Sequence, residues 1–181
     1  MSIDWNAELS EQLDLHWNQH FRPRLATLTD DEYFWEPVGD CWSIRPQYDG
    51  HLMIDWAYPE PSPPPVTTIA WRLAHIIIGV FAMRNASHFD GPSVDYQTFP
   101  YAGSAAEALK QLDDAYARWR DGVRGLTAED LERPCGEAEG PYSEYPLATL
   151  VLHINREAIH HGAEILMLRD LYRSRPRTDR V

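Results

Sequence analysis

The sequence has few cysteines, no excess of basic residues and no long apolar run. It carries 16 lysine and arginine residues against 28 aspartate and glutamate residues, so its net charge is −12. This balance argues against a nucleic-acid partner, because no basic stripe is available to replace the counterions of phosphate groups. The longest uncharged run, residues 73–83, is too short to span a bilayer. We therefore expect neither nucleic acid nor a membrane among the partners.

The cysteines and the first residues both indicate a reducing compartment. Cys41 and Cys135 lie far apart in the sequence and outside any spacing that is typical of a metal site. The N-terminal residues have neither the basic nor the apolar region of a secretory signal. We expect a cytoplasmic protein. With 181 residues, 44% of them hydrophobic and 24% charged, the chain is expected to form one domain over residues 1–181, with a frayed basic tail over about 174–181.

Four stretches show the helical spacing of apolar residues. Pro23 is expected to bend or break the end of the first helix, and Thr67 or Thr68 to cap the second. Ser104 and Glu107 form a capping-box pattern at the start of the third. The expected helices span residues 4–28, 67–88, 104–124 and 145–174, with a short helical turn at 127–130. Four helices with one long connection predict an all-α four-helix bundle.

The connection between the first two helices, about residues 30–66, is rich in aromatic residues and proline. Residues 40–58 alternate in part but are interrupted by Pro46 and Gly50, so we interpret them as a long aromatic loop that can include a short hairpin. The alternative is a genuine two-stranded ribbon. Residues 59–65 contain five prolines and are expected to be extended. The aromatic side chains are candidates either for a lid over a site or for a satellite hydrophobic cluster.

A candidate metal site lies on the second and fourth helices. Glu157 and His161 are four residues apart, so both side chains project from the same helix face. His75 is the one polar side chain in the apolar run 73–83 of the second helix. Two imidazoles and one carboxylate that leave coordination positions open are typical of catalytic zinc, and the same set suits non-haem iron. From periodicity alone, hydrogen-bonded core histidines and a surface carboxylate are an equal alternative.

Other residues are weaker candidates. His16 and His20 are one turn apart on the first helix and are candidates for ligands, ligand-supporting donors or substrate contacts. His153 is a candidate third ligand or a support for the ligands, whereas His160 should point ~100° away from His161, so the two should not easily share one metal. Three arginines are candidates to bind a substrate carboxylate, with surface salt bridges as the alternative: Arg45, Arg72 and Arg156.

One further pattern concerns the outer side of the fourth helix. Leu152, Ile159 and Leu166 follow one another at seven-residue spacing, opposite the expected metal-facing edge. An outward apolar stripe often marks a partner surface. We therefore expect a homodimer.

The sequence resembles the DinB/YfiT-like superfamily of metal-binding four-helix bundles over nearly its whole length. The most specific segments of the resemblance are residues 71–76, 155–165 and 168–172. The family places one metal-ligand histidine in the second helix and a pair of ligands four residues apart in the later helix, which implies His75, Glu157 and His161 as ligands here. Trp71 and Arg156, within the same segments, are candidate substrate contacts.

The resemblance also carries an expectation about chemistry. Many members have histidine at the position of Glu157, and the Glu form is similar to that of mycothiol-dependent maleylpyruvate isomerase and its relatives, whose metal is zinc. Members with three histidines have been associated with nickel or zinc. The resemblance implies a divalent metal, a bundle that often dimerises, and a transferase or isomerase that uses a low-molecular-weight thiol such as mycothiol or bacillithiol. The chain has no sterol-carrier-like C-terminal domain, so maleylpyruvate isomerisation itself is not expected.

Two other functions stay open on the sequence. A metal-bound water acting as nucleophile would make the protein a metal-dependent hydrolase. A metal that only supports folding would make it a non-enzymatic, stress-associated module that binds a small molecule or a partner.

Overall fold

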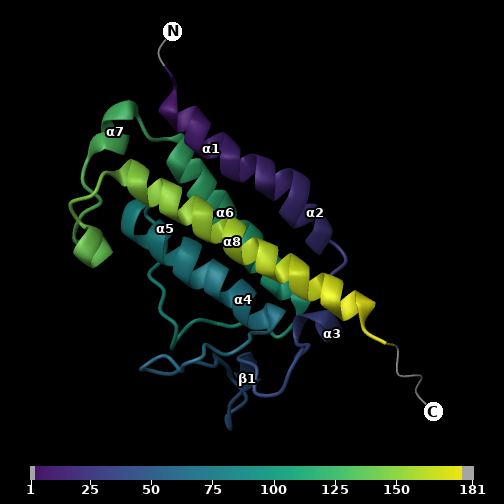
Figure 1. Cartoon of the computed structure of the whole chain (residues 1–181). Coiled ribbons are helices and arrows are strands. Elements are labelled where there is room, and N and C mark those ends of the chain that lie inside the picture. The colour runs from purple at the N-terminus through teal and green to yellow at the C-terminus, as the bar shows by residue number, and fades with distance from the viewer. Residues whose placement is uncertain (1–2, 177–181) are drawn as a thin grey trace.

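The computed structural model describes residues 3–176 and is mostly helical (Figure 1). The longest helical segments are α1 (Trp5–His16) continued by η1 (Trp17–Phe21) and α2 (Arg22–Leu25); α4 (Ile69–His75) continued by η2 (Ile76–Ala82) and α5 (Met83–His88); α6 (Ala105–Arg124); and α8 (Leu147–Ser174). The short elements are α3 (Asp30–Tyr33), β1 (Ile44–Pro46), β2 (Leu52–Ile54), α7 (Ala128–Glu132) and the 3₁₀ segment η3 (Glu137–Tyr142).

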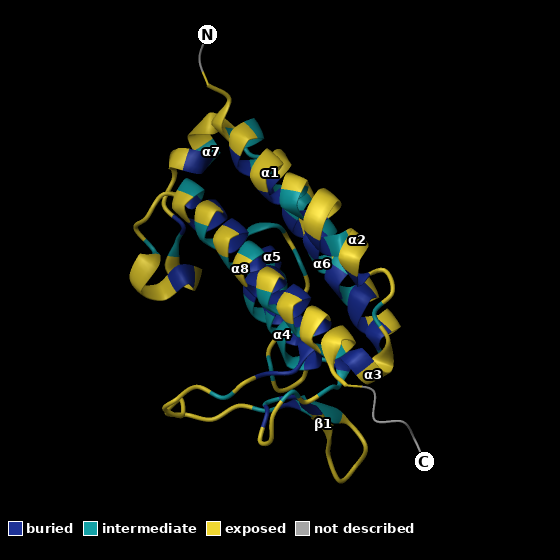
Figure 2. Cartoon of the chain, turned by 45° about the vertical axis from the view of Figure 1, so that its right-hand side comes forward, coloured by how far each residue is buried: buried dark blue, intermediate teal, exposed yellow. Residues whose placement is uncertain are grey.

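The four long segments lie lengthwise beside one another, and the two strands lie at one end of them (Figure 1). α1 contacts both α6 and α8, and η2 contacts the same two helices. The buried faces turn toward the space between the segments (Figure 2). Large side chains that fill this core include Trp17, Phe81, Leu112, Trp119 and Ile154. Within residues 3–176 no helix has the length and apolar character needed to cross a membrane.

Of the two effects predicted for Pro23, a break of the first helical segment is wrong, and a bend stays a prediction. The segment passes through this residue and ends at Leu25, earlier than the expected Leu28. The turn before the proline is widened, and the N–H of Arg22 donates to the carbonyl of Trp17, five residues back. A wider turn accommodates a residue that has no N–H and whose ring crowds the preceding turn. The proline therefore changes the helix locally without ending it.

The predicted caps of the other helices are mostly confirmed. The hydroxyl of Thr68 accepts from the N–H of Trp71 at 3.2 Å, and that of Ser104 accepts from the N–H of Glu107 at 3.2 Å. The capping box at Ser104 is only half formed, because the Glu107 carboxylate accepts from Gly103 instead. A complete capping box starts the short helix α7 at Thr127. Local hydrogen bonds of this kind explain why these helix starts are readable in the sequence.

The connection before α4 contains a short hairpin, and this confirms that part of the interpretation. β1 and β2 are antiparallel, with Ile44 opposite Ile54 and Pro46 opposite Leu52. Pro46 is tolerated because it closes a strand in a sheet of only two strands. The indole N–H of Trp71 donates to the carbonyl of Asp55 at 2.7 Å and ties the hairpin to α4.

The expected apolar stripe on α8 is wrong at one residue. Leu152 is exposed and Ile159 is half-buried, but Leu166 is only 8% exposed and belongs to the core. Leu166 shares a helix face with Asn155, whose side-chain amide donates to the carbonyl of Leu9 in α1. That face of α8 therefore packs inside the molecule.

Candidate metal centre

Between α4 and α8, His161 lies next to both of the other predicted ligands, His75 and Glu157. The rings of His75 and His161 lie edge to face, with 4.8 Å between their centroids. Nε2 of His161 lies 3.5 Å from Oε2 of Glu157. His75 is the last residue of α4, directly before the π-helical segment η2. Widened helical turns of this type are frequent at functional sites.

The outer nitrogen of each imidazole already has a partner. Nδ1 of His161 lies 2.8 Å from Oε2 of Glu164, and Nδ1 of His75 lies 3.2 Å from the hydroxyl of Tyr96. A carboxylate at Nδ1 favours the tautomer with its proton there, which leaves the lone pair on Nε2. Metal-binding histidines typically have their second nitrogen hydrogen-bonded in this way. Glu164 therefore favours the form of His161 whose Nε2 can bind a metal, and Tyr96 holds the ring of His75 through Nδ1.

The two oxygens of Glu157 have different surroundings. Oε1 accepts from Nε and an Nη of Arg156, both at 3.2 Å, and lies 3.6 Å from Nδ1 of His153. Oε2 faces His161 instead. One oxygen thus holds the carboxylate in position while the other is available to a metal. Arg156 contacts the proposed ligand itself, and its predicted role as a substrate contact stays a prediction.

The ionisation states suit a cation. Burial, with His161 and Arg72 nearby, lowers the pKa of His75 to about 4. Burial also lowers the pKa of His161, although the hydrogen bond to Glu164 opposes this shift. Burial raises the pKa of Glu157, but the hydrogen bond from Arg156 and the nearby histidines outweigh it and hold the pKa below its ordinary value. Two neutral imidazoles and an ionised carboxylate are the forms that bind metal.

Two residues that sequence reasoning missed shape the site around His75. A Cβ added at Gly79 would overlap with the Tyr96 hydroxyl and lie 3.3 Å from the His75 ring. The absence of a side chain at Gly79 thus lets Tyr96 reach His75. Gly79 is one turn after His75 within an apolar helix, and an isolated glycine there is itself a signal of close packing. The indole of Trp71 also stacks on the ring of His75, with 5.4 Å between the ring centroids and 15° between the ring planes.

A second possible metal cluster overlaps the first. His160, His161 and Glu164 offer donor atoms that all lie within 4.8 Å of one another. This corrects the expectation that His160 and His161 cannot easily share one metal, because their donor atoms come close enough to do so. Glu164 is three and four residues beyond them, so its carboxylate reaches both rings.

Arg72 argues against a cation at this second cluster. Its Nε lies 3.1 Å from Oε2 of Glu164, and a terminal nitrogen lies 3.4 Å from Nδ1 of His161. A fixed guanidinium at these atoms repels a metal ion. Glu164 therefore fits better as the partner that orients His161.

His16 lies beside Gly162 of α8, and His20 lies on the surface of the first helical segment. The ring of His16 stacks on Phe21, and a Cβ added at Gly162 would lie 3.4 Å from its Nε2. His20 is exposed, 6.2 Å from His16 between ring centroids. No hydrogen bond or ring contact within residues 3–176 joins either histidine to His75 or Glu157. Their predicted role as substrate contacts stays a prediction.

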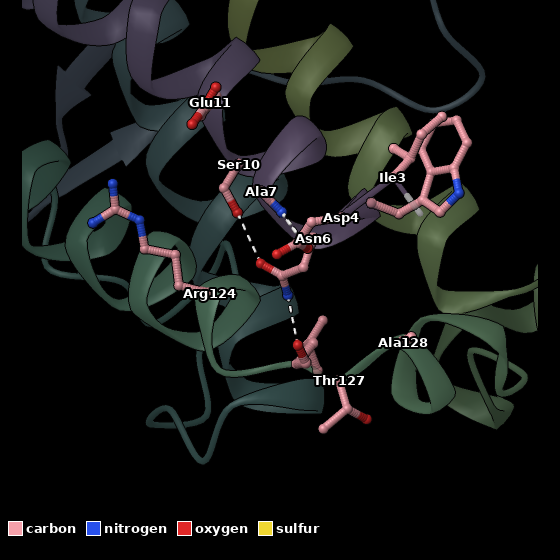
Figure 3. A pocket seen from close by; sticks show the side chains of 11 residues that line it. Ile3, Asp4, Asn6, Ala7, Ser10, Glu11, Arg124, Thr127 and Ala128 are labelled. Carbon is pink, nitrogen blue, oxygen red and sulfur yellow. Dashed lines mark hydrogen bonds between the residues drawn. The ribbon is translucent and has the colours of Figure 1, made fainter. Parts of the chain in front are cut away.

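A cavity of about 690 Å³ at the start of α1 contains none of the predicted ligands in its wall (Figure 3). The side-chain amide of Asn6 donates there to the carbonyls of Val123 and Leu126, both at 2.7 Å. These bonds satisfy carbonyls at the end of α6, which is a structural role. Another hollow, of about 600 Å³, lies beside the first half of α8 and has His153 and Arg156 in its wall. Since both contact Glu157, this hollow adjoins the candidate metal centre.

Comparison with known proteins agrees with the sequence resemblance. The family model described as the DinB superfamily matches residues 12–165, which include all three predicted ligands. No curated protein and no solved structure matches the chain.

Proposed function

The chain belongs to the DinB superfamily, and from this premise we propose that it binds a divalent metal through His75, Glu157 and His161. The observation that carries the proposal is the orientation of the two imidazoles. Glu164 and Tyr96 occupy the Nδ1 atoms, and the Nε2 atom of His161 faces the free oxygen of Glu157. Zinc is the expected metal, and nickel or iron also suits this set. We interpret the four long helical segments as the four-helix bundle that the resemblance implies.

The proposed activity is that of a thiol-dependent S-transferase or isomerase. When bound, the metal would stabilise the thiolate of a low-molecular-weight thiol of the mycothiol or bacillithiol type, the form that attacks. The residues of the chain hold the ligands in place: Arg156 restrains Glu157, and Glu164 orients His161. We also propose that the protein is cytoplasmic and forms a homodimer that acts on a small molecule.

Metal analysis of the purified protein tests the binding proposal. We expect close to one equivalent of a divalent metal per chain, and its loss in His75→Ala. His51→Ala is the matched control, because His51 is an exposed histidine of the hairpin whose neighbour is Asp49. Protein without metal, or unchanged metal content in His75→Ala, would contradict the proposal.

A substrate screen tests the activity. The metal-loaded protein is offered electrophiles together with a panel of low-molecular-weight thiols and, separately, simple esters and amides. Thiol consumption that requires metal supports the transferase. Hydrolysis without thiol supports the hydrolase instead. A large loss of melting temperature on chelation without any turnover supports a metal that serves folding.

A further inference from the structure

The hollow beside the first half of α8 has the character of a ligand site. It lies between α5, η3 and α8, and its volume of about 600 Å³ suits a small organic molecule. Leu150 and Leu152 line it from α8, and Tyr142 and Tyr145 from η3 and the segment after it. Apolar and aromatic side chains with a few charged groups are typical of sites for small molecules. The charged residues that line it are Arg84, Glu139 and Arg156, and His153 lies beside them.

The hollow and the metal centre share a wall. Arg156 donates to Oε1 of Glu157 at 3.2 Å, while Oε2 of the same carboxylate faces His161. His153 lies beside both, with its Nδ1 2.6 Å from a terminal nitrogen of Arg156 and 3.6 Å from Oε1 of Glu157. A molecule in the hollow would therefore contact the group that holds Glu157. Only the Glu157 carboxylate would then separate the end of the molecule at Arg156 from the metal.

The charges in this hollow favour an anion. Glu139 is the single carboxylate among the described residues that line it, although the whole chain has a net charge of −12. The Glu139 carboxylate is already paired, because Oε1 accepts from His88 at 2.9 Å and Oε2 pairs with Arg84 at 3.2 Å. A metal would take up the charge of Glu157. The guanidinium of Arg156, whose side chain is 69% exposed, then lacks a full counter-charge at the mouth of the hollow.

We propose that the hollow between α5, η3 and α8 binds a small organic carboxylate with an apolar or aromatic body. The carboxylate pairs with Arg156 at the end next to Glu157, and the body packs on Leu150, Tyr142 and Tyr145. Planar, bidentate recognition of a carboxylate is what a guanidinium does best. This inference rests on the proposed metal site, since a metal at Oε2 would offset the negative charge of Glu157 beside Arg156. It names the class of substrate that would be presented to that site.

Calorimetry with the zinc-loaded protein tests the proposal. The probes are cinnamate, its neutral amide and phenyl phosphate, each titrated into the wild type and into Arg156→Gln. We expect cinnamate to bind at least about tenfold more tightly than the amide, and about tenfold more weakly to Arg156→Gln, which corresponds to the loss of one charge-assisted pairing. Phenyl phosphate separates a general anion site from a carboxylate site. Arg118→Gln is the control, because Arg118 is an exposed arginine in the wall of a different hollow.

The possible outcomes separate this inference from the metal proposal. Zinc content is measured for every variant, and cinnamate binding is compared only between zinc-loaded samples, because Arg156 also restrains Glu157. Equal binding of cinnamate and its amide overturns the inference. Unchanged cinnamate binding in Arg156→Gln also overturns it, because the carboxylate would then simply bind the metal. If phenyl phosphate binds more tightly than cinnamate, the hollow prefers phosphate esters and the proposed carboxylate class is wrong. A protein that binds no zinc but still binds cinnamate through Arg156 refutes the metal proposal alone.

Discussion

Nδ1 of His161 lies 2.8 Å from Oε2 of Glu164, while Nε2 of the same ring faces Glu157. The side chain thus bridges two carboxylates of its own helix, one turn on either side. The two carboxylates have different roles in the proposed site. Glu164 orients the ring, and Glu157 is proposed to bind the same metal as the ring. Arg72 also pairs with Glu164 at 3.1 Å, so the orienting carboxylate is itself held from α4.

Removal of the orienting carboxylate should weaken metal binding without abolishing it. In Glu164→Ala the imidazole of His161 loses its partner at Nδ1, and the dissociation constant for zinc should rise by about 10- to 100-fold, as for other partners of metal-binding histidines. Competition with a chromogenic chelator measures the change. Glu129→Ala, at an exposed glutamate of α7, should leave the constant unchanged.

The rival cluster makes a different prediction. If the metal bound to His160, His161 and Glu164, His160→Ala would lower the affinity as strongly as Glu164→Ala. We expect zinc affinity to be unaffected by His160→Ala and lost in Glu157→Ala. If His160→Ala abolished zinc binding and Glu157→Ala left it unaffected, the metal would bind to His160, His161 and Glu164 instead.

Gly79 should tolerate no side chain while Tyr96 is present. A glycine-to-alanine change inside a helix ordinarily stabilises by about 1 kcal/mol. Here the new Cβ would overlap with the Tyr96 hydroxyl, so Gly79→Ala should lower the melting temperature and the zinc affinity. The double variant Gly79→Ala/Tyr96→Phe removes the overlapping oxygen and should recover the melting temperature. If the double variant is no more stable than the single one, the close approach is not the cause.

The metal-free protein should lose stability as the pH falls from about 6.5 to about 4. Burial lowers the pKa of His75 to about 4 in the folded state, whereas the unfolded chain takes up this proton near pH 6.5. Between these values the unfolded state binds more protons, so unfolding becomes easier as the pH drops. The pKa difference corresponds to about 3 kcal/mol at most. Urea unfolding in the presence of a chelator measures it, and His75→Asn should flatten this part of the profile.

A buried ion pair between α3 and α8 should matter more for stability than its exposed neighbour. Arg169 and Glu32 are 1% and 3% exposed, and their charged groups lie 2.9 Å apart. Arg169→Met leaves Glu32 buried without its main partner, which should cost about 3 kcal/mol in the free energy of unfolding. Arg173→Met removes an exposed partner of the same carboxylate and should cost less than about 1 kcal/mol.

The double variant provides the control for this pair. Arg169→Met/Glu32→Met removes both charges and should recover much of the lost stability, because no buried charge is left unpaired. Equal losses in Arg169→Met and Arg173→Met, measured by urea unfolding, would show that burial does not decide the contribution.

Much of the fold and part of the site could be read from the sequence. The caps at Thr68, Ser104 and Thr127 involve hydrogen bonds across three residues, so local sequence determines where those helices begin. The spacing of Glu157 and His161 likewise places both on one face of a helix. Pro23 was harder to interpret, because whether a helix ends or widens at a proline depends on what packs around it.

The sequence by itself determined the helices, their caps and the three residues proposed to bind the metal. The tertiary structure alone decided which groups hold the two histidine rings. Tyr96 reaches His75 from a segment without helical periodicity, and Arg72 reaches Glu164 from another helix. Propensity and capping act within about one turn of helix, whereas the orientation of an imidazole depends on contacts between residues far apart in the chain. For that reason the candidate ligands were predictable and their supporting partners were not.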